Sequence, residues 1–398
     1  MKKAILSLVL AAGTCVATWA TVHAPNIGGI YYNLDDETHQ GTVMGCNVNG
    51  SITLPATVNY QNETYQITDI APYAFLDKRG VTQVTIQQGS LTTIGNQAFS
   101  NSGIVAITLP ESLTTIGSSV FYGADKLNSI VIPDGVTAIG DRAFTGCNSL
   151  EQIKLPAGIT TISEFMFSGC NSLKSLDIPE GVTTINAFAI TNCAGLTSVN
   201  LPSTLQRLEQ ASISGNPGIT AITLPQSLRF IGENTLAFLG ISSITIPEGV
   251  TTIEDYAFAQ NNHLRSASIP GTVTSLGSLF TDCPGLARVY YRGTTISAPG
   301  VEAFAPELWE SSMHLIVSKG MKNKIDEDML WYYFPVITEE VNGDVDANGT
   351  ADVSDVNDDI NTLLGKGDAV NAAGADVNHD GIIDISDVSQ LINIILNK

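Results

Sequence analysis

The chain has 398 residues, enough for two or three domains with buried cores. Hydrophobic residues make up 43% of the sequence and charged residues 14%, which excludes a chain that is disordered throughout. The 39 acidic and 18 basic residues give a net charge of -21, and such a surface repels the phosphates of nucleic acids. With 6 cysteines a disulfide scaffold is not expected, and after the N-terminus no apolar run is long enough to span a bilayer.

The first residues follow the order of a secretory signal peptide. Lys2 and Lys3 precede an apolar run over residues 4–16, and small residues come next. We therefore expect residues 1–24 to be removed by cleavage after Ala24, with cleavage after Ala20 as the alternative. The mature protein is then secreted or at the cell surface and has no transmembrane segment.

Residues 25–69 are predicted to form an N-terminal β cap. Short apolar segments from residue 29 to residue 67 indicate strands, and Asn49 with Gly50 is typical of a hairpin turn between two of them.

An internal repeat follows this cap and occupies most of the chain. Ile-Pro or Leu-Pro recurs at nearly constant intervals, at Pro110, Pro133, Pro156, Pro179, Pro202, Pro225, Pro247 and Pro270. An L-x-x-I-x-L pattern before each proline predicts one short strand, and a second apolar pair follows, such as Ile116 with Phe121. One repeat cannot bury both apolar rows, but stacked repeats can, so residues 70–304 predict a solenoid of about ten repeats.

The unit L-x-x-I-x-[IL]-P, followed by I-G-x-x-[AS]-F and then Cys, resembles the BspA-like leucine-rich repeats of bacterial surface proteins. The resemblance covers roughly residues 26–337. It implies a leucine-rich-repeat solenoid, with a parallel β-sheet of short strands and helical turns on the convex side. It also implies a non-catalytic binding surface for host proteins or other cells.

The cysteines of the repeats share one position. Cys147, Cys170 and Cys193 follow one another at intervals of one repeat, and Cys283 holds the same place later. We interpret them as a structural ladder of reduced thiols, with a disulfide between neighbouring turns as the alternative. The histidines are scattered, so we expect no tetrahedral metal set.

The outward strand positions are mostly small or hydroxylic, and six larger polar residues among them form a candidate ligand face. These are Glu151, Gln152, Lys154, Lys174, Asp177 and Arg265. Because Glu151 and Lys174 are one repeat apart, as are Lys154 and Asp177, we expect exposed cross-strand ion pairs and not a catalytic dyad. No nucleophile, metalloprotease or phosphate-loop motif occurs, so we do not expect an enzyme.

Few aromatic residues lie on this face before Tyr290, which favours a protein or glycoprotein ligand over a single oligosaccharide. The alternative is that the strand face is solvated and the caps bind the ligand. The cap residues for that alternative are Tyr31, Tyr32, Trp309 and Trp331.

Residues 305–338 are predicted to form the C-terminal cap. The sequence indicates a strand at 315–317, a short helix at 321–329 and a last segment at 331–336.

The segment 341–398 is rich in aspartate and contains two loops with the spacing of EF-hand calcium loops. The first offers oxygen ligands from Asp344, Asp346, Asn348, Thr350, Asp352 and Asp355. The second offers them from Asp376, Asn378, Asp380, Ile382, Asp384 and Asp387, with Thr350 and Ile382 using their carbonyl groups. Carboxylates this close repel one another unless a cation lies between them. The flexible oxygen shell of calcium suits these loops best, so we predict two calcium ions.

Apolar residues follow each loop at helical spacing, whereas the segment before the first loop is too short for a helix. This duplicated order and the aspartate that ends each loop resemble a type I dockerin over residues 341–398, a small all-α domain with paired EF-hand-like loops. The resemblance implies calcium-dependent docking to a cohesin module on a scaffold protein. It assigns the docking contacts to Val353, Ser354, Ile385 and Ser386.

The sequence as a whole predicts an exported, non-catalytic binding protein. Its repeats engage a protein or glycan ligand, and its dockerin docks it to a cohesin-type scaffold of an extracellular assembly linked to polysaccharide breakdown. The alternative is a cell-surface adhesin that binds host or bacterial proteins, with the C-terminal module only stabilising or tethering the chain.

Overall fold

The computed structural model describes residues 5–7, 18–20, 22–273, 278–293, 313–318, 336–339, 351, 356–357, 360, 375, 377, 383 and 385–396. The chain forms two compact units, Met1–Gly218 and Ile219–Lys398. Among the described residues there is no helix long and apolar enough to cross a membrane.

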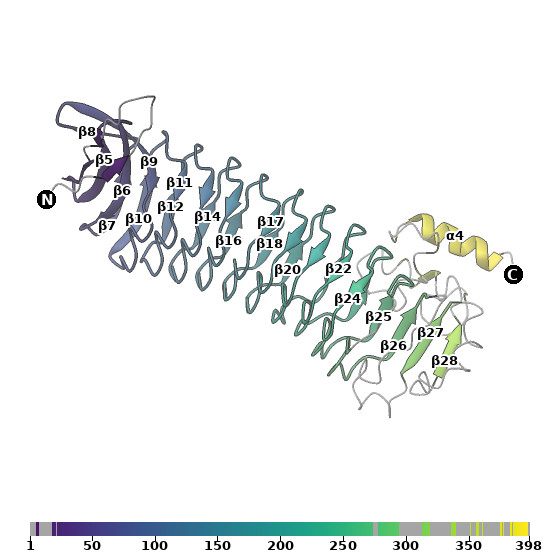
Figure 1. Ribbon diagram of the computed structural model, residues 1–398. Coiled ribbons are helices and arrows are strands. Elements are labelled where there is room, and N and C mark those ends of the chain that lie inside the picture. Colours follow the sequence, from purple (N-terminus) through teal and green to yellow (C-terminus); the bar gives the residue numbers. More distant parts are fainter. Residues whose placement is uncertain are drawn as a thin grey trace, which may run out of the picture. The chain divides into compact units, whose positions relative to one another are not determined.

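Strands precede the repeats in the first unit; those from residue 26 on lie in the predicted cap, and the earlier ones lie within the predicted signal peptide (Figure 1). The strands are β1 (Ile5–Ser7), β2 (Thr18–Ala20), β3 (Val22–His23), β4 (Asn26–Ile27), β5 (Ile30–Asp35), β6 (Gln40–Cys46), β7 (Gly50–Leu54), β8 (Thr57–Tyr60) and β9 (Glu63–Ile70). β3, β4 and β6 pair with β5 in antiparallel fashion, and β9 pairs with β6 in parallel.

The predicted hairpin turn at Asn49 and Gly50 is wrong, because β6 and β7 belong to different sheets. This segment instead carries the chain from one sheet to the other. A two-residue hairpin joins β8 to β9, with Tyr60 opposite Glu63. Its turn residues Gln61 and Asn62 have φ of 52° and 69°, and positive φ at both positions is the mark of a type I′ turn.

Each repeat of the first unit contributes two strands, one more than the sequence predicts. The longer ones are β10 (Val81–Ile86), β12 (Ala106–Thr108), β14 (Ser129–Val131), β16 (Gln152–Lys154), β18 (Ser175–Asp177) and β20 (Ser198–Asn200). The two-residue ones are β11 (Thr93–Ile94), β13 (Thr115–Ile116), β15 (Ala138–Ile139), β17 (Thr161–Ile162), β19 (Thr184–Ile185) and β21 (Arg207–Leu208). Strands of each kind pair in parallel with their own kind, for example β14 with β16 and β13 with β15.

The predicted helical turns are absent from residues 22–273, where turns without helix link the strands. Two residues of each such turn have positive φ, as in Ser119 at 56° with Gly123 at 64°, and Arg142 at 58° with Gly146 at 72°. A right-handed helix cannot continue through residues in this conformation. The spacing of the apolar residues therefore reflects stacking between repeats and not a helical face.

The second apolar row forms the centre of the core, as predicted. Phe75, Phe99, Phe121, Phe144 and Phe167 are fully buried. Successive rings in this row are stacked, with centroids 4.8 to 5.7 Å apart. Contacts of this kind contribute about 0.5–1.5 kcal/mol per pair beyond burial alone. Ile190 and Ile213 take the aromatic place in the last turns of this unit and are also buried.

The second unit contains the same kind of repeat. Its strands are β22 (Phe230–Ile231), β23 (Ser243–Thr245), β24 (Thr252–Ile253), β25 (Ser266–Ile269), β26 (Arg288–Tyr291), β27 (His314–Val317) and β28 (Val336–Glu339). β23, β25, β26, β27 and β28 form one parallel sheet in this order. The predicted strand at 315–317 is confirmed within β27, and the predicted helix at 321–329 lies outside the described residues.

Helix α4 (Ile385–Leu396) begins within the last residues of the second predicted calcium loop. It packs its buried Leu391 against Ala351, Ala375 and Val377. The helical spacing predicted for this segment is therefore correct.

Candidate functional site

The candidate site is the outer face of the longer strands of the first unit, hereafter the strand face. In β12, β14, β16, β18 and β20 the middle of three residues is the least exposed, and the flanking residues are wholly or partly exposed. The middle side chain packs toward the core, so the two flanking side chains of each strand project outward. Ala106, Ser129 and Gln152 lie in one row, because Ala106 pairs with Ser129 and Ser129 with Gln152.

The structure places five of the six predicted ligand-face residues on the first unit. Glu151, Gln152, Lys154, Lys174 and Asp177 are all exposed on or beside β16 and β18. Arg265 belongs to the second unit, where Nη1 of its exposed side chain is 3.5 Å from the carbonyl of Asn262.

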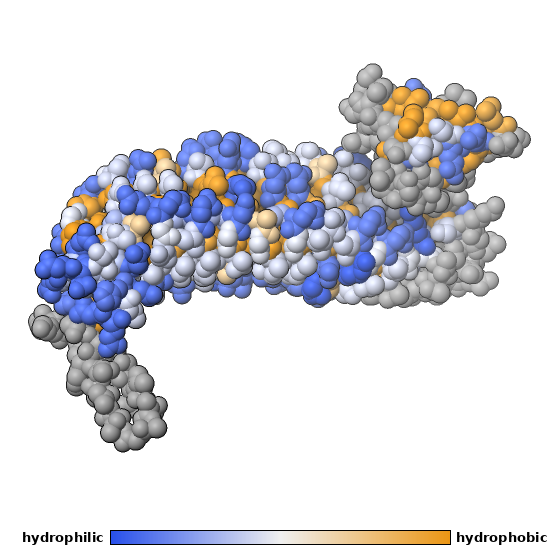
Figure 2. All heavy atoms as spheres, turned by 90° about the horizontal axis from the view of Figure 1, so that it is seen from above, coloured by the Kyte–Doolittle hydropathy of each residue, from blue (hydrophilic) through white to orange (hydrophobic). Residues whose placement is uncertain are grey.

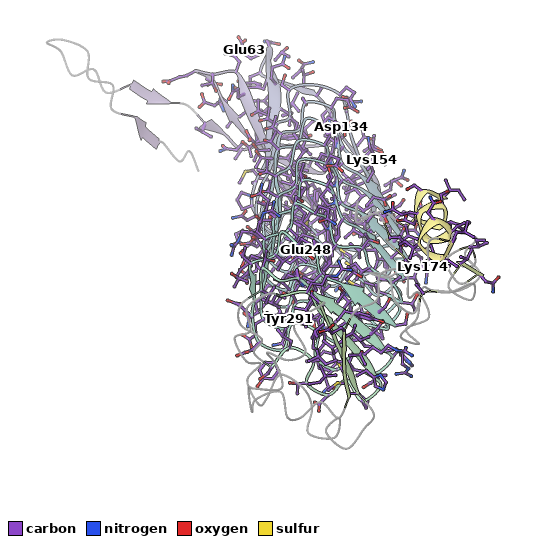
Figure 3. All side chains as sticks on the ribbon, turned by 90° about the vertical axis from the view of Figure 1, so that its right-hand side faces the viewer. Glu63, Asp134, Lys154, Lys174, Glu248 and Tyr291 are labelled. Atoms are coloured by element: carbon purple, nitrogen blue, oxygen red, sulfur yellow. The ribbon has the colours of Figure 1, made fainter. Side chains whose placement is uncertain are left out.

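The predicted ion pair between Lys154 and Asp177 is wrong. Lys154 Nζ lies 3.4 Å from Oδ2 of Asp134, which follows Pro133 in the preceding repeat. Asp177 instead accepts a hydrogen bond from the side-chain amide of Asn200 on the adjacent strand. Figure 3 shows Lys154 beside Asp134. The long side chain of Lys154 extends beyond its strand to the turn that contains Asp134. The two residues are not one full repeat apart, so a search for opposite charges at the repeat interval does not find this pair.

The predicted pair between Glu151 and Lys174 is also not formed among the described residues. β16 and β18 do not share a sheet, so the register that would bring these two side chains opposite each other is interrupted there. Both side chains are exposed, and both charges remain available to a ligand.

The strand face is hydrophilic apart from small apolar areas. Val105 and Val131 are the large hydrophobic residues exposed on it, at 45% and 63%. Figure 2 shows one side of the molecule, where hydrophilic residues prevail over the repeats with small hydrophobic areas between them. A broad surface of polar groups with isolated apolar contacts suits a protein ligand better than a small molecule.

One of the two cap tyrosines suggested as alternative contacts is part of the core. Tyr32 is 2% exposed, whereas Tyr31 is 40% exposed. The two alternate along β5, so only one of them faces solvent. Trp309 and Trp331 lie outside the described residues.

The cysteine ladder is buried and has a defined hydrogen-bonding role. The thiols of Cys147, Cys170 and Cys193 donate to the carbonyls of Phe121, Phe144 and Phe167 over 3.0 to 3.2 Å. These cysteines are free, and burial raises the pKa of Cys193 to about 11. A buried thiol with a raised pKa is a poor nucleophile, which agrees with a structural role.

The ladder contains a member that the cysteine spacing alone does not reveal. Asn216, one repeat after Cys193, is fully buried and donates to the carbonyls of Ile190 and Ile213 at 2.7 and 2.6 Å. In the second unit Asn261 does the same toward Leu236 and Phe258. A search for asparagine and cysteine at one repeat position finds both residues.

Most residues of the predicted calcium loops lie outside the described part of the chain, as do Val353 and Ser354. Asp387 is described, and it is fully buried in the first turn of α4. Ile385 and Ser386 are exposed at the start of that helix. Elsewhere in the described residues, no group of three or more His, Cys, Asp or Glu could hold a metal ion.

The sequence matches a protein family described as the BspA type leucine rich repeat region, in 6 copies, over residues 68–197 and 183–306. No curated protein matches the chain.

Solved structures of leucine-rich repeat proteins are similar to this chain. A leucine-rich repeat protein from Bacteroides ovatus shares the fold and is 24% identical, with 78% of this chain and 90% of that one covered and a TM-score of 0.51. A leucine rich cell surface protein from Faecalibacterium prausnitzii is 20% identical, with 80% and 95% covered and a TM-score of 0.45.

Proposed function

Because the chain belongs to the BspA type leucine rich repeat family, we propose that it is an exported, non-catalytic protein that binds a protein or glycoprotein through its strand face. The observation that carries this proposal is the regular outward placement of two side chains on each of the longer strands β12, β14, β16, β18 and β20. The stack of repeats behind these strands holds their backbone in place, so a ligand would bind with little loss of backbone entropy and would order only the exposed side chains.

Charge reversal at the two lysines of the strand face tests this proposal. Full-length protein carrying Lys154→Glu and Lys174→Glu should fail to capture the ligand that the wild-type protein captures from the producer's envelope. Lys126→Glu, an exposed lysine in a turn of the same unit, is the control and should capture it normally. Equal capture by all three proteins would place the ligand away from the strand face.

For the C-terminal part, the proposal is a calcium-bound dockerin-like module that docks to a cohesin-type scaffold. Three apolar side chains of α4, Ile385, Ile392 and Leu396, are 71%, 41% and 76% exposed. They recur at helical spacing, so they lie along one side of α4 and offer an apolar contact for a partner. Asp387 is fully buried in the first turn of α4, at the last ligand position of the second loop, and its carboxylate oxygens are of the kind that calcium binds.

Binding of the full-length protein to a purified type I cohesin, with calcium and with excess chelator, tests the docking. We expect binding only with calcium, and loss of binding in Ile385→Asp. Calcium binding without cohesin binding would favour the adhesin, in which the module stabilises or tethers the chain. If the module docks to a cohesin, the protein is a component of an extracellular assembly. The proposed link to polysaccharide breakdown then depends on the other proteins of that assembly.

A further inference from the structure

A second surface of the first unit, separate from the strand face, carries three side chains in a stack. Arg142, Phe165 and Phe188 come from successive repeats and occupy the same place in the turn that follows each two-residue strand. The rings of Phe165 and Phe188 are stacked with centroids 4.8 Å apart and planes at 7°. The guanidinium carbon of Arg142 lies 4.6 Å from the centre of the Phe165 ring.

The backbone holds this stack rigidly. All three residues have positive φ, at 58°, 54° and 56°. The backbone N–H of each donates to a carbonyl of the next repeat, from Arg142 to Glu164, from Phe165 to Ala187 and from Phe188 to Gln210. Positive φ disfavours a bulky side chain relative to glycine, because the Cβ atom approaches the following carbonyl oxygen. The phenylalanines of two successive repeats, Phe165 and Phe188, therefore occupy positions where the left-handed backbone conformation favours smaller residues.

The stack ends at Phe188. The next residue of the row is Ala211, and its methyl group is too short to cover an aromatic ring. Phe188 is only partly buried, in contrast to the fully buried phenylalanines of the core. One face of its ring packs against Phe165, and the opposite face has no aromatic or cationic neighbour among the described residues of the first unit.

The contact at the other end of the stack indicates what kind of group fits on Phe188. Arg142 places its cation over the electron-rich face of Phe165, and its Nη2 lies 3.8 Å from Oε1 of Glu164. Carboxylates also lie beside the row in the sequence, since Asp141 and Glu164 precede Arg142 and Phe165, and Glu209, which pairs with Arg207 at 2.7 Å, lies two residues before Ala211. The first unit carries 15 acidic and 9 basic residues, a net charge of -6. A surface with an excess of acidic groups and a partly exposed aromatic ring that lacks a cationic neighbour attracts a cation and repels an acidic or phosphorylated ligand.

We infer that Phe188 is a docking point for an arginine side chain of a basic partner protein, which stacks on its free face as Arg142 stacks on Phe165. Arginine is favoured over lysine because its planar guanidinium lies flat on a ring and is more weakly hydrated. This surface is additional to the strand face and does not depend on the calcium module.

Binding of a hexa-arginine peptide to the full-length protein tests the inference, with a hexa-lysine peptide for comparison. The arginine peptide should bind more tightly. Phe188→Leu keeps an apolar side chain of similar size but removes the aromatic ring, so it should weaken arginine binding about two- to fivefold. Phe238→Leu is the matched control, since Phe238 is 50% exposed, has a φ of 59° and belongs to the second unit.

A second variant predicts a change in the opposite direction. Arg142→Ala uncovers the ring of Phe165 and should tighten binding of the arginine peptide. Arg79→Ala is the control, because Arg79 pairs with Asp125 at 3.0 Å and does not contact an aromatic ring of the stack. Both variants lose one positive charge, so a larger gain in binding by Arg142→Ala measures the effect of uncovering the Phe165 ring. Circular dichroism on all variants checks that they fold.

Three results would overturn the inference. They are equal binding by Phe188→Leu and Phe238→Leu, equal gains in Arg142→Ala and Arg79→Ala, and binding that does not distinguish arginine from lysine. None of these results affects the proposal for the strand face, which is tested at Lys154 and Lys174.

Discussion

Nδ2 of Asn216 donates to the carbonyl of Ile190 at 2.7 Å, which is the contact that the thiol of Cys193 makes with Phe167 at 3.0 Å in the preceding repeat. Oδ1 of Asn216 also accepts the backbone N–H of Cys193 at 2.8 Å. The amide therefore joins neighbouring repeats more extensively than the thiol does, because it both donates and accepts.

Asn216→Ala should reduce the free energy of unfolding by about 2–3 kcal/mol, since it leaves buried backbone groups without partners. Cys170→Ala removes one weak donor and should cost about 1 kcal/mol. Denaturant unfolding of both variants measures the difference. Equal losses would mean that the amide contributes no more than the thiol.

For Ser102→Ala, which also removes a buried polar group, we predict no loss of stability. The hydroxyl of Ser102 is buried and has no hydrogen-bond partner among the described residues. Removal of this hydroxyl should leave the free energy of unfolding unchanged or raise it by up to about 1 kcal/mol. The folded protein loses no hydrogen bond, and the cost of burying an unpaired polar group disappears. A clear destabilisation in the same assay would show that this hydroxyl has a partner.

Tyr65 and Asp36 predict how the stability of the cap depends on pH. Tyr65 donates from its hydroxyl to Oδ1 of Asp36 at 2.5 Å, which lowers the pKa of Asp36 and raises the pKa of Tyr65 to about 12. A lowered carboxylate pKa stabilises the fold above the ordinary value near 4, and this stabilisation is lost as the pH falls further. A raised phenol pKa stabilises it below about pH 10, and this is lost between pH 10 and about 12.

Tyr65→Phe should therefore lower the free energy of unfolding by about 1–2 kcal/mol between pH 5 and 9. The difference from the wild-type protein should shrink in acid and again above pH 10. Denaturant titrations across this range, with Tyr60→Phe as the control in the same cap, measure it. A difference that stays constant with pH would exclude Asp36 as the cause.

The C-terminal module is predicted to lose helix when calcium is removed. Excess chelator should reduce the far-ultraviolet signal of α4 and leave the β signal of the repeats, because uncompensated carboxylates repel one another. Asp376→Ala should weaken calcium binding at the second loop, and Asp344→Ala at the first. Asp368→Ala, outside both loops, is the control. Calorimetry that finds no calcium binding to the wild-type protein contradicts the predicted sites.

The start of the mature chain is also open to measurement. Val22 and His23 form β3, which pairs with β5, and Nε2 of His23 lies 2.9 Å from Oδ2 of Asp36. Removal of these residues would break the pairing, so the cap favours cleavage after Ala20 over cleavage after Ala24. If the predicted signal peptide is cleaved, mass spectrometry of the processed protein should find Thr21 at its N-terminus. A chain that begins at Pro25 would show that β3 is dispensable.

The sequence by itself determined the repeat, its length and its buried rows. The residues of the phenylalanine row are visible because the same apolar type returns at the same position of successive repeats, and stacking is the arrangement that buries all of them. The helix at 385–396 follows from spacing in the same way. Burial imposes strict limits on side-chain type, so buried positions leave a strong pattern.

Only the tertiary structure decided the contacts at the surface. Lys154 pairs with Asp134 and not with Asp177, because an exposed, flexible side chain takes whichever opposite charge the local geometry brings near. The stack at Phe188 depends on positive φ angles in the turns. The later positive-φ position of each turn is visible in the sequence as a recurring Gly or Asn, such as Gly146. The earlier one is held by a hydrogen bond to the next repeat and accepts residues as different as Ser119 and Phe165, so residue type does not reveal it.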